Sequence, residues 1–319
     1  MQDVYTDISE ALKKLDFNRE PSGLYSPIAY ALESGGKRMR PALALMATDM
    51  LGGRREDIMP AALALEVFHN FTLLHDDLMD NADTRRGRPA VHKKWNKNTA
   101  ILSGDQMLIE SYKLISQTPQ QYLTESLELF SLMASQICEG QQYDMDFEQR
   151  RDVTIAEYTD MIRLKTAVLP ATALQLGALV SAASETIQKE IYLFGINLGL
   201  AFQLRDDYLD VFGDPATFGK TIGGDILDKK KTYLYITAYK NATPAQAQQL
   251  DYWFDCPEKE TKIKEITQLY KATAADMQCL DQIGNYHRQA ALHLQNIEVS
   301  PEAKQPLSIL LDRLLTRNK

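Results

Sequence analysis

Two clusters of aspartates are the part of the sequence best suited to chemistry. Each follows the pattern Asp-Asp-x-x-Asp and comes directly after an apolar run. On a helix the first and last aspartates of such a cluster share a face, where their negative charges repel one another. Mg²⁺ would relieve this repulsion, because it binds carboxylate oxygens and shares its remaining positions with substrate phosphates. The pattern favours a metal–diphosphate site over two solvated helix ends, at Asp76, Asp77, Asp80, Asp206, Asp207 and Asp210.

Basic residues accompany these clusters. A polar, basic loop is expected at Asn81–Asn98 after the first cluster, and a Gly-rich one at Gly213–Lys231 after the second. Near the N-terminus the segment GGKRMRP places Lys37 and Arg40 beside glycines, which let the backbone approach an anion closely. Alone, such a basic turn is typical of an ordinary charged surface. Together with two acidic clusters, it predicts two bound diphosphates, one held through metal and one held directly by cations.

Helices must position these residues, because long segments rich in Ala, Leu, Met, Glu and Gln dominate the chain. Pro170 is expected to kink or split one of these segments. Thr232–Tyr239 has a β-type composition, yet we assign it to a helix because an isolated strand could not pair. The predicted fold class is therefore all-α. The main predicted helices are Pro60–Leu78, Ile101–Ser116, Leu123–Cys138, Ile155–Val180, Glu185–Asp210 and Lys262–Gln278.

Composition limits the remaining possibilities. The chain has 319 residues, 45% of them hydrophobic, and no linker-like segment divides it, so we expect one domain over residues 1–319, a large helical bundle around an apolar cavity. A net charge of −8 argues against a nucleic-acid partner. The most apolar stretch, Ala171–Ala183, is too short for a membrane span. Three distant cysteines and an N-terminus unlike a signal peptide favour the cytoplasm.

Four motifs resemble those of the trans-isoprenyl diphosphate synthases (polyprenyl synthetases) of the short-chain type. In the family order they are GGKRMRP, HNFTLLHDDLMDNADTRRGRP, RLKTAVLP and FQLRDDYLDVFGDPATFGKTIGGDI. They cover about residues 35–232, whereas 251–319 is similar only loosely. The resemblance implies the isoprenoid synthase fold, a homodimer, and a Mg²⁺-dependent condensation of isopentenyl diphosphate with allylic diphosphates to a short all-trans product.

The resemblance also implies roles for single residues. Isopentenyl diphosphate would be bound by Lys37, Arg40, His69 and Arg86, with Gly36 beside them. Three Mg²⁺ would be held by Asp76, Asp80 and Asp206, with the other three aspartates in support. The allylic diphosphate would contact Arg85, Lys165, Lys220 and Lys230, and the developing carbocation would face Thr166 and Gln203.

Three points stay open. Lysines occupy 229–231 where the family usually has Gly-Lys, so Lys229 could replace Lys230 as the phosphate ligand. His69 lies in an apolar segment and could be a core histidine. A terpene cyclase shares the implied fold but needs neither GGKRMRP nor the second cluster, and a non-catalytic subunit would be expected to have lost aspartates.

Product length is predicted from two phenylalanines. Phe71 lies five residues before Asp76 and Phe68 three further back, so both rings share one helix face. In the family, an aromatic residue here marks short-chain enzymes, because it forms a floor for the growing tail. This favours a C20 geranylgeranyl product over C15 farnesyl, although both rings could be ordinary core.

Overall fold

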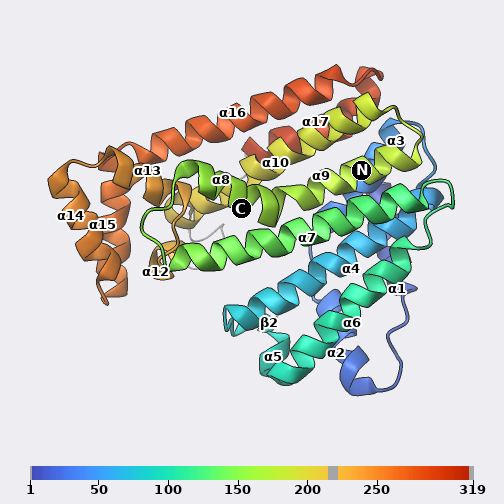
Figure 1. Ribbon diagram of the computed structural model, residues 1–319, viewed down its shortest axis with the longest axis horizontal. Helices are drawn as coiled ribbons and strands as arrows, with labels where there is room; N and C mark the ends of the chain where they lie inside the picture. The colour runs from blue at the N-terminus through green and yellow to red at the C-terminus, as the bar shows by residue number, and fades with distance from the viewer. Residues whose placement is uncertain (1, 215–221, 316–319) are drawn as a thin grey trace. The chain divides into compact units, whose positions relative to one another are not determined.

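The structure, a computed structural model, describes residues 2–214 and 222–315. Helices make up most of this part of the chain (Figure 1), and two short strands are the only other regular elements among the described residues, which confirms the predicted all-α class. Its α-helices are α1 (Gln2–Lys13), α2 (Ser22–Glu33), α3 (Met39–Met50), α4 (Arg55–Met79), α5 (Val91–Lys94), α6 (Lys97–Ile115), α7 (Leu123–Glu148), α8 (Ile155–Ile162), α9 (Val168–Val180), α10 (Glu185–Phe212), α12 (Gly224–Leu227), α13 (Tyr233–Asn241), α14 (Pro244–Asp255), α15 (Lys259–Ala272), α16 (Ala275–Asn296) and α17 (Pro301–Leu315).

The chain forms two compact units, which are described one at a time. Unit 1 comprises Met1–Ser131, Thr172–Lys189 and Val299–Ala303. Unit 2 comprises Leu132–Ala171, Glu190–Glu298 and Lys304–Lys319. The first aspartate cluster belongs to unit 1 and the second to unit 2. The single domain expected over 1–319 stays a prediction.

Unit 1 is built around α4, which packs against α3 and lies beside α6 (Figure 1). Every residue from Ala61 to Phe68 is buried, so this helix is covered on nearly all sides. Its alanines leave room for close neighbours, and Phe68 is among the largest fully buried side chains. The helix ends at Asp80, its C-cap, which places the first cluster at the C-terminal end as predicted.

Unit 2 contains the C-terminal part of α10, which ends at Phe212 just after the second cluster. In the same unit α13 packs against α8, α15 and α16, and α14 lies beside α15. The segment with β-type composition is α13, as we assigned it. Five of its nine residues are Tyr, Ile or Thr, but burial against three helices outweighs their local strand preference.

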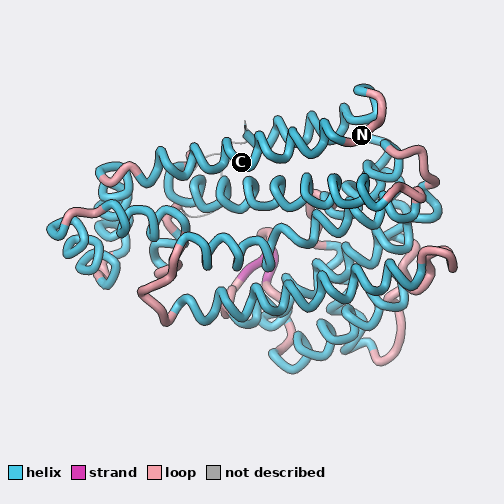
Figure 2. The backbone as a smooth tube through the Cα atoms, turned by 45° about the horizontal axis from the view of Figure 1, so that its top comes forward, coloured by secondary structure: helices cyan, strands magenta, loops and turns pink. Residues whose placement is uncertain are grey.

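Three predicted elements are wrong. Gly213–Lys231 is not a plain loop, because its described part contains the short helix α12. Asn81–Asn98 is not a plain loop: it holds a hairpin of β1 (Thr84–Arg85) and β2 (Arg88–Pro89), shown in magenta in Figure 2, as well as α5 and the start of α6. Strands of two residues are too short to show alternation. The predicted helix Lys262–Gln278 is divided between α15 and α16, because Ala274 is left-handed with φ 56°. No Gly or Pro marks that break in the sequence.

The expected break in Ile155–Val180 occurs upstream of Pro170. Residues Arg163–Ala167 form a π-helical turn between α8 and α9, and the N–H of Val168 bonds to the carbonyl of Arg163, five residues back. Pro170 has no N–H, and in a regular helix its ring would clash with the carbonyl of residue 166. The wide turn directly before it avoids that clash.

Candidate active site

The first aspartate cluster is tied to the hairpin that follows it. Asp77 is buried, and Arg85 on β1 donates hydrogen bonds to its carboxylate from both Nε and Nη2, with Nε 2.9 Å from Oδ1 and 3.1 Å from Oδ2. Arg86 and Gly87 form the hairpin turn with φ 53° and 73°, as a type I′ turn requires. Arg85, predicted to bind the allylic diphosphate, therefore lies against the acidic cluster, whereas the Arg86 guanidinium bonds to Ser34 and Gly35.

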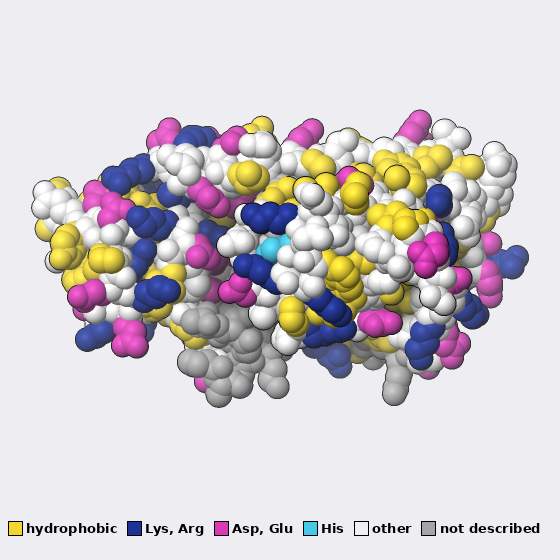
Figure 3. Space-filling model, turned by 90° about the horizontal axis from the view of Figure 1, so that it is seen from below, with side chains coloured by type: hydrophobic (Ala, Val, Ile, Leu, Met, Phe, Trp, Pro, Cys, Tyr) yellow, Lys and Arg dark blue, Asp and Glu magenta, His cyan; other side chains and the backbone are white. Residues whose placement is uncertain are grey.

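A group of cations surrounds His69 on α4. Burial is the main cause that lowers the pKa of His69 well below its usual value, and the positive charges of Arg40, Arg86, Arg85 and Arg38 lower it further. Burial also lowers the pKa of Arg40 to about 10, and its Nε has no hydrogen-bond partner among the described residues. Figure 3 shows basic side chains beside a histidine on one face of the molecule. The group includes Arg40, His69 and Arg86, three of the residues predicted to bind isopentenyl diphosphate, and its positive charge suits an anion.

The second aspartate cluster lines a cavity of about 180 Å³ in unit 2. Its wall also includes residues predicted for the allylic substrate, namely Lys165, Thr166, Gln203 and Lys230. Apolar side chains, among them Phe147 and Met161, complete it. The pocket thus combines carboxylates, ammonium groups and an apolar wall, which suits a diphosphate with a hydrocarbon tail.

Hydrogen bonds fix the carboxylates of this cavity. Asp207 accepts from the hydroxyl of Tyr158 and from the Gln203 amide, whose Nε2 lies 2.9 Å from Oδ1. Asp210 Oδ2 accepts from the N–H of Asp225 at 3.0 Å. Burial raises the pKa of Asp207 to about 8, and the negative charge of Asp225 adds to the rise. Carboxylate oxygens are the ligands that Mg²⁺ prefers, so the residue types around this cavity suit that cation.

The π-helical turn presents two predicted residues to the cavity. Lys165 Nζ lies 2.6 Å from Asp144 Oδ2, and the hydroxyl of Thr166 donates to Gln203 Oε1 at 3.1 Å. Helix α7 approaches this turn very closely at Gly140. A Cβ at that position would lie 2.3 Å from the backbone nitrogen of Lys165. Only glycine at residue 140 lets the turn reach its place beside α7.

The three consecutive lysines have different surroundings. Lys229, with φ 58°, turns to Asp255, whose Oδ1 lies 2.6 Å from its Nζ. Lys230 lines the cavity, 3.6 Å from Asp225 Oδ1. Lys231 bonds the carbonyl of Glu148 at 2.9 Å. Of the two candidates for the phosphate contact, this arrangement favours Lys230.

The remaining predicted site residues are the glycine and lysine of GGKRMRP, the two phenylalanines and Lys220. Gly36 has φ 134°, and Lys37 beside it is exposed. Phe71 and Phe68 are buried with ring centroids 5.4 Å apart. Lys220 lies outside the described residues. Among the described residues no three carboxylate, imidazole or thiol side chains already converge in a metal-binding geometry, so metal binding by Asp76, Asp80 and Asp206 stays a proposal.

Sequence reasoning missed Tyr158, Asp144 and Asp225 as parts of the cavity. Tyr158 bonds a residue 49 positions away, a distance that no local pattern reveals. Asp225 lies in the GGDI end of the last motif and could have been singled out there. Asp144 had no such signal.

Comparison with known proteins decides the family. The sequence profile described as polyprenyl synthetase matches residues 21–273. The chain is a member of the polyprenyl synthetase family. Membership confirms the resemblance, the fold class and the predicted enzyme class, a prenyltransferase. No helix in the described part of this family member is long and apolar enough to cross a membrane.

Individual relatives resemble this polyprenyl synthetase over nearly its whole length. A crystal structure of a geranylgeranyl pyrophosphate synthase is 45% identical with TM-score 0.94, covering 100% of this chain and 99% of that one. The geranylgeranyl diphosphate synthase of Methanosarcina mazei is 35% identical, over 92% of this chain and 85% of its own. A geranylgeranyl pyrophosphate synthase from Corynebacterium glutamicum, in complex with isoprenyl diphosphate and magnesium, is 27% identical with TM-score 0.87, covering 99% and 98%.

Proposed function

We propose that this prenyltransferase condenses isopentenyl diphosphate head-to-tail with allylic diphosphates in a Mg²⁺-dependent reaction. The product is a short all-trans prenyl diphosphate, C20 in preference to C15. The observation that carries the proposal is the cavity of unit 2, where Asp206, Asp207 and Asp210 share one wall with Lys165 and Lys230. Relatives named as geranylgeranyl diphosphate synthases support the C20 product.

The acidic clusters are the proposed metal sites. Asp76, Asp80 and Asp206 would hold three Mg²⁺, supported by Asp77, Asp207 and Asp210. The presence of Asp206, Asp207, Asp210 and Asp225 around one cavity supports this assignment, since hard cations prefer carboxylate oxygens. When bound, the metal supplies charge neutralisation for the departing diphosphate.

Protein groups do the remaining work on the allylic substrate. Lys165, Lys230 and Arg85 bind its diphosphate and stabilise the negative charge that grows as the carbon–oxygen bond breaks. Thr166 and Gln203 orient each other by their hydrogen bond and direct their oxygen atoms toward the allylic cation. Phe147 and Met161 exclude water, which would otherwise capture the cation.

The second substrate binds in unit 1. Lys37, Arg40 and Arg86 contact the diphosphate of isopentenyl diphosphate, and His69 donates its single N–H as a neutral imidazole. The double bond of this substrate attacks the allylic cation, a new carbon–carbon bond forms, and the proton lost afterwards passes to the released diphosphate. We further propose that the chain acts as a cytoplasmic homodimer and is a single domain.

The test is an assay of the purified chain alone with isopentenyl diphosphate and an allylic primer. We expect turnover with Mg²⁺, none with EDTA, and a C20 product by mass spectrometry. A terpene cyclase would release a hydrocarbon without consuming isopentenyl diphosphate, and a non-catalytic subunit would show no turnover until a partner chain is added. Either result overturns the proposal.

A further inference from the structure

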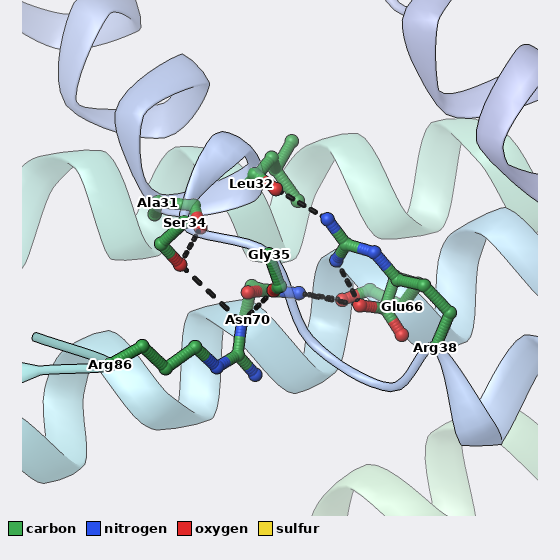
Figure 4. Close-up of polar contacts among 8 residues, drawn as sticks. All are labelled: Ala31, Leu32, Ser34, Gly35, Arg38, Glu66, Asn70 and Arg86. Carbon is green, nitrogen blue, oxygen red and sulfur yellow. Dashed lines mark hydrogen bonds and ion pairs between the residues drawn. The ribbon is translucent and has the colours of Figure 1, made fainter.

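The loop between α2 and α3 is held by a buried ion pair. Arg38, the N-cap of α3, forms an ion pair with Glu66 of α4 and also donates to the carbonyl of Leu32 (Figure 4). Asn70, one turn further along α4, donates its amide to Glu66 Oε1 at 3.1 Å and to the Glu66 carbonyl at 2.8 Å. Arg38, Glu66 and Asn70 are called the clasp below.

The hairpin holds the same loop from another side. Arg86 donates to the carbonyl of Gly35 and lies 3.4 Å from the hydroxyl of Ser34 (Figure 4). Gly36, next to Gly35, has φ 134°, a conformation that residues with a Cβ rarely adopt, so the backbone of the loop favours glycine there. The loop is therefore fixed between α4 and the hairpin. Lys37 and Arg40 follow directly from the residues that make these contacts.

Burying the carboxylate of Glu66 lowers the stability of the fold, so a purely structural role would not favour glutamate at this position. Its side chain is 3% exposed and lies on a helix whose neighbours are apolar. A buried carboxylate destabilises a protein unless it is paired and hydrogen-bonded, and here one Arg and one Asn satisfy that condition. Its negative charge also opposes the fall in the pKa of Arg40 and of Arg86. Glu66 thus allows several guanidinium groups to lie close together before any substrate arrives.

We propose that Glu66, oriented by Asn70, is a positioning residue for isopentenyl diphosphate: it holds Arg38 in the left-handed conformation that directs Lys37 and Arg40 to the diphosphate. Arg38 has φ 45°, a conformation that is unfavourable for arginine and persists only where contacts impose it. The clasp supplies those contacts. The inference rests on the proposed function and adds a residue that does not itself touch substrate.

A simpler electrostatic explanation predicts the opposite effect of Glu66→Gln on the binding of isopentenyl diphosphate. If Glu66 only placed a negative charge near the anion, replacing it with Gln would strengthen diphosphate binding. Replacing Arg38 with Gln would weaken binding, and the double variant would return to the wild-type value. If the clasp positions the loop, each single variant binds isopentenyl diphosphate more weakly than the wild type. The double variant then binds no more weakly than the single variant with the larger loss, because each single change already breaks the same Arg38–Glu66 contact.

The experiment measures kcat and both KM values for Glu66→Gln, Arg38→Gln and the double variant. We expect each to raise the KM for isopentenyl diphosphate about tenfold, in line with the loss of one charge-assisted contact, with the allylic KM unchanged. Glu110→Gln is the control: it also removes a charge in unit 1, together with ion pairs to Arg19 at 3.2 Å and to Lys113 at 3.1 Å, and both KM values should stay as in the wild type. Thermal unfolding followed by circular dichroism checks the fold of each variant.

A lower KM for isopentenyl diphosphate in Glu66→Gln, or equal rises in both KM values, would overturn the inference. If Glu66→Gln does not fold, Asn70→Ala keeps the ion pair and removes only the orienting amide. It should raise the same KM about threefold, and an unchanged value would also overturn the inference. Absence of turnover in the wild-type chain would instead contradict the proposed function, so the two failures can be told apart.

Discussion

At the scale of single residues, neighbouring side chains and backbone conformation determine properties that the residue type alone does not, such as the charge state of His69. His69 was predicted as a phosphate ligand with a core histidine as the alternative, and four arginine charges near it favour the ligand. The sequence alone could not show which lysine of 229–231 contacts the phosphate, because three identical side chains in a row differ only in the direction that the backbone gives them. The left-handed Lys229 makes that difference.

The pKa of His69 leads to a prediction about pH. Because its folded pKa lies well below 6.5, the unfolded chain gains a proton first as the pH falls. The stability that neutral His69 contributes is thus present above pH 6.5 and is lost as the pH decreases from there toward the folded pKa. We expect the Tm of the wild type to fall more steeply between pH 7 and pH 5 than that of His69→Gln. Parallel curves would contradict this.

The lysines give a second prediction. Lys230→Ala should raise the KM for the allylic diphosphate about 10- to 100-fold, as expected for a lost charge-assisted contact. Lys229→Ala removes the same charge from the neighbouring position but breaks only its ion pair with Asp255 at the surface. Steady-state kinetics should show little change in that variant. The reverse order would make Lys229 the phosphate ligand.

At the scale of elements, the long helices were predictable and the short pieces between them were not. The helix that carries the first cluster was predicted from Pro60 and begins at Arg55; Glu56 and Asp57, acidic residues in its first turn, were the missed signal. The hairpin at Thr84–Pro89 was missed because its turn, Arg86–Gly87, is not one of the Asn-Gly or Asp-Gly pairs that mark such turns. Tertiary contacts with Asp77 stabilise it instead.

Helix α4 also carries the prediction on product length. Phe71 packs edge-to-face on His75 at 4.8 Å, and Phe68 lies between Phe71 and Phe130 with 5.4 Å to each ring. If this stack is the floor, Phe71→Ala should lengthen the product, and Phe71→Ala combined with Phe68→Ala should lengthen it again.

Mass spectrometry of the products checks this expectation. Phe254→Ala, which truncates a buried phenylalanine of unit 2, is the control: it should lower stability by about 3–5 kcal/mol, as Phe to Ala changes in cores do, and leave product length unchanged. An unchanged length distribution in Phe71→Ala would mean that both rings are ordinary core.

At the scale of the whole molecule, the fold class and the residues of both acidic clusters were predictable, since composition and spacing carry them. The contacts that join distant segments were not. The bond from Tyr158 to Asp207 and the clasp at Glu66 depend on which helices pack together, and local sequence patterns do not encode that choice.

Both clusters should be needed for catalysis, although they belong to different units. Asp76→Ala and Asp206→Ala should each lower kcat on the order of 10²–10³, the usual effect of removing one interaction from a preorganised electrostatic site. Circular dichroism should show the helical content unchanged. Near wild-type turnover in either variant, or full activity in EDTA, would be incompatible with the proposed metal sites.

The close contact between Gly140 and the π-helical turn restricts how this chain can be recombined with its relatives. A π turn holds one residue more than the α-helical turn it replaces, so deleting any residue of Arg163–Ala167 would rotate Lys165 and Thr166 off the cavity wall. A chimaera that takes α7 from a relative with a larger residue at position 140 would push the same turn away. The segment from 140 to 167 should therefore be exchanged only as one block, with crossover points outside it.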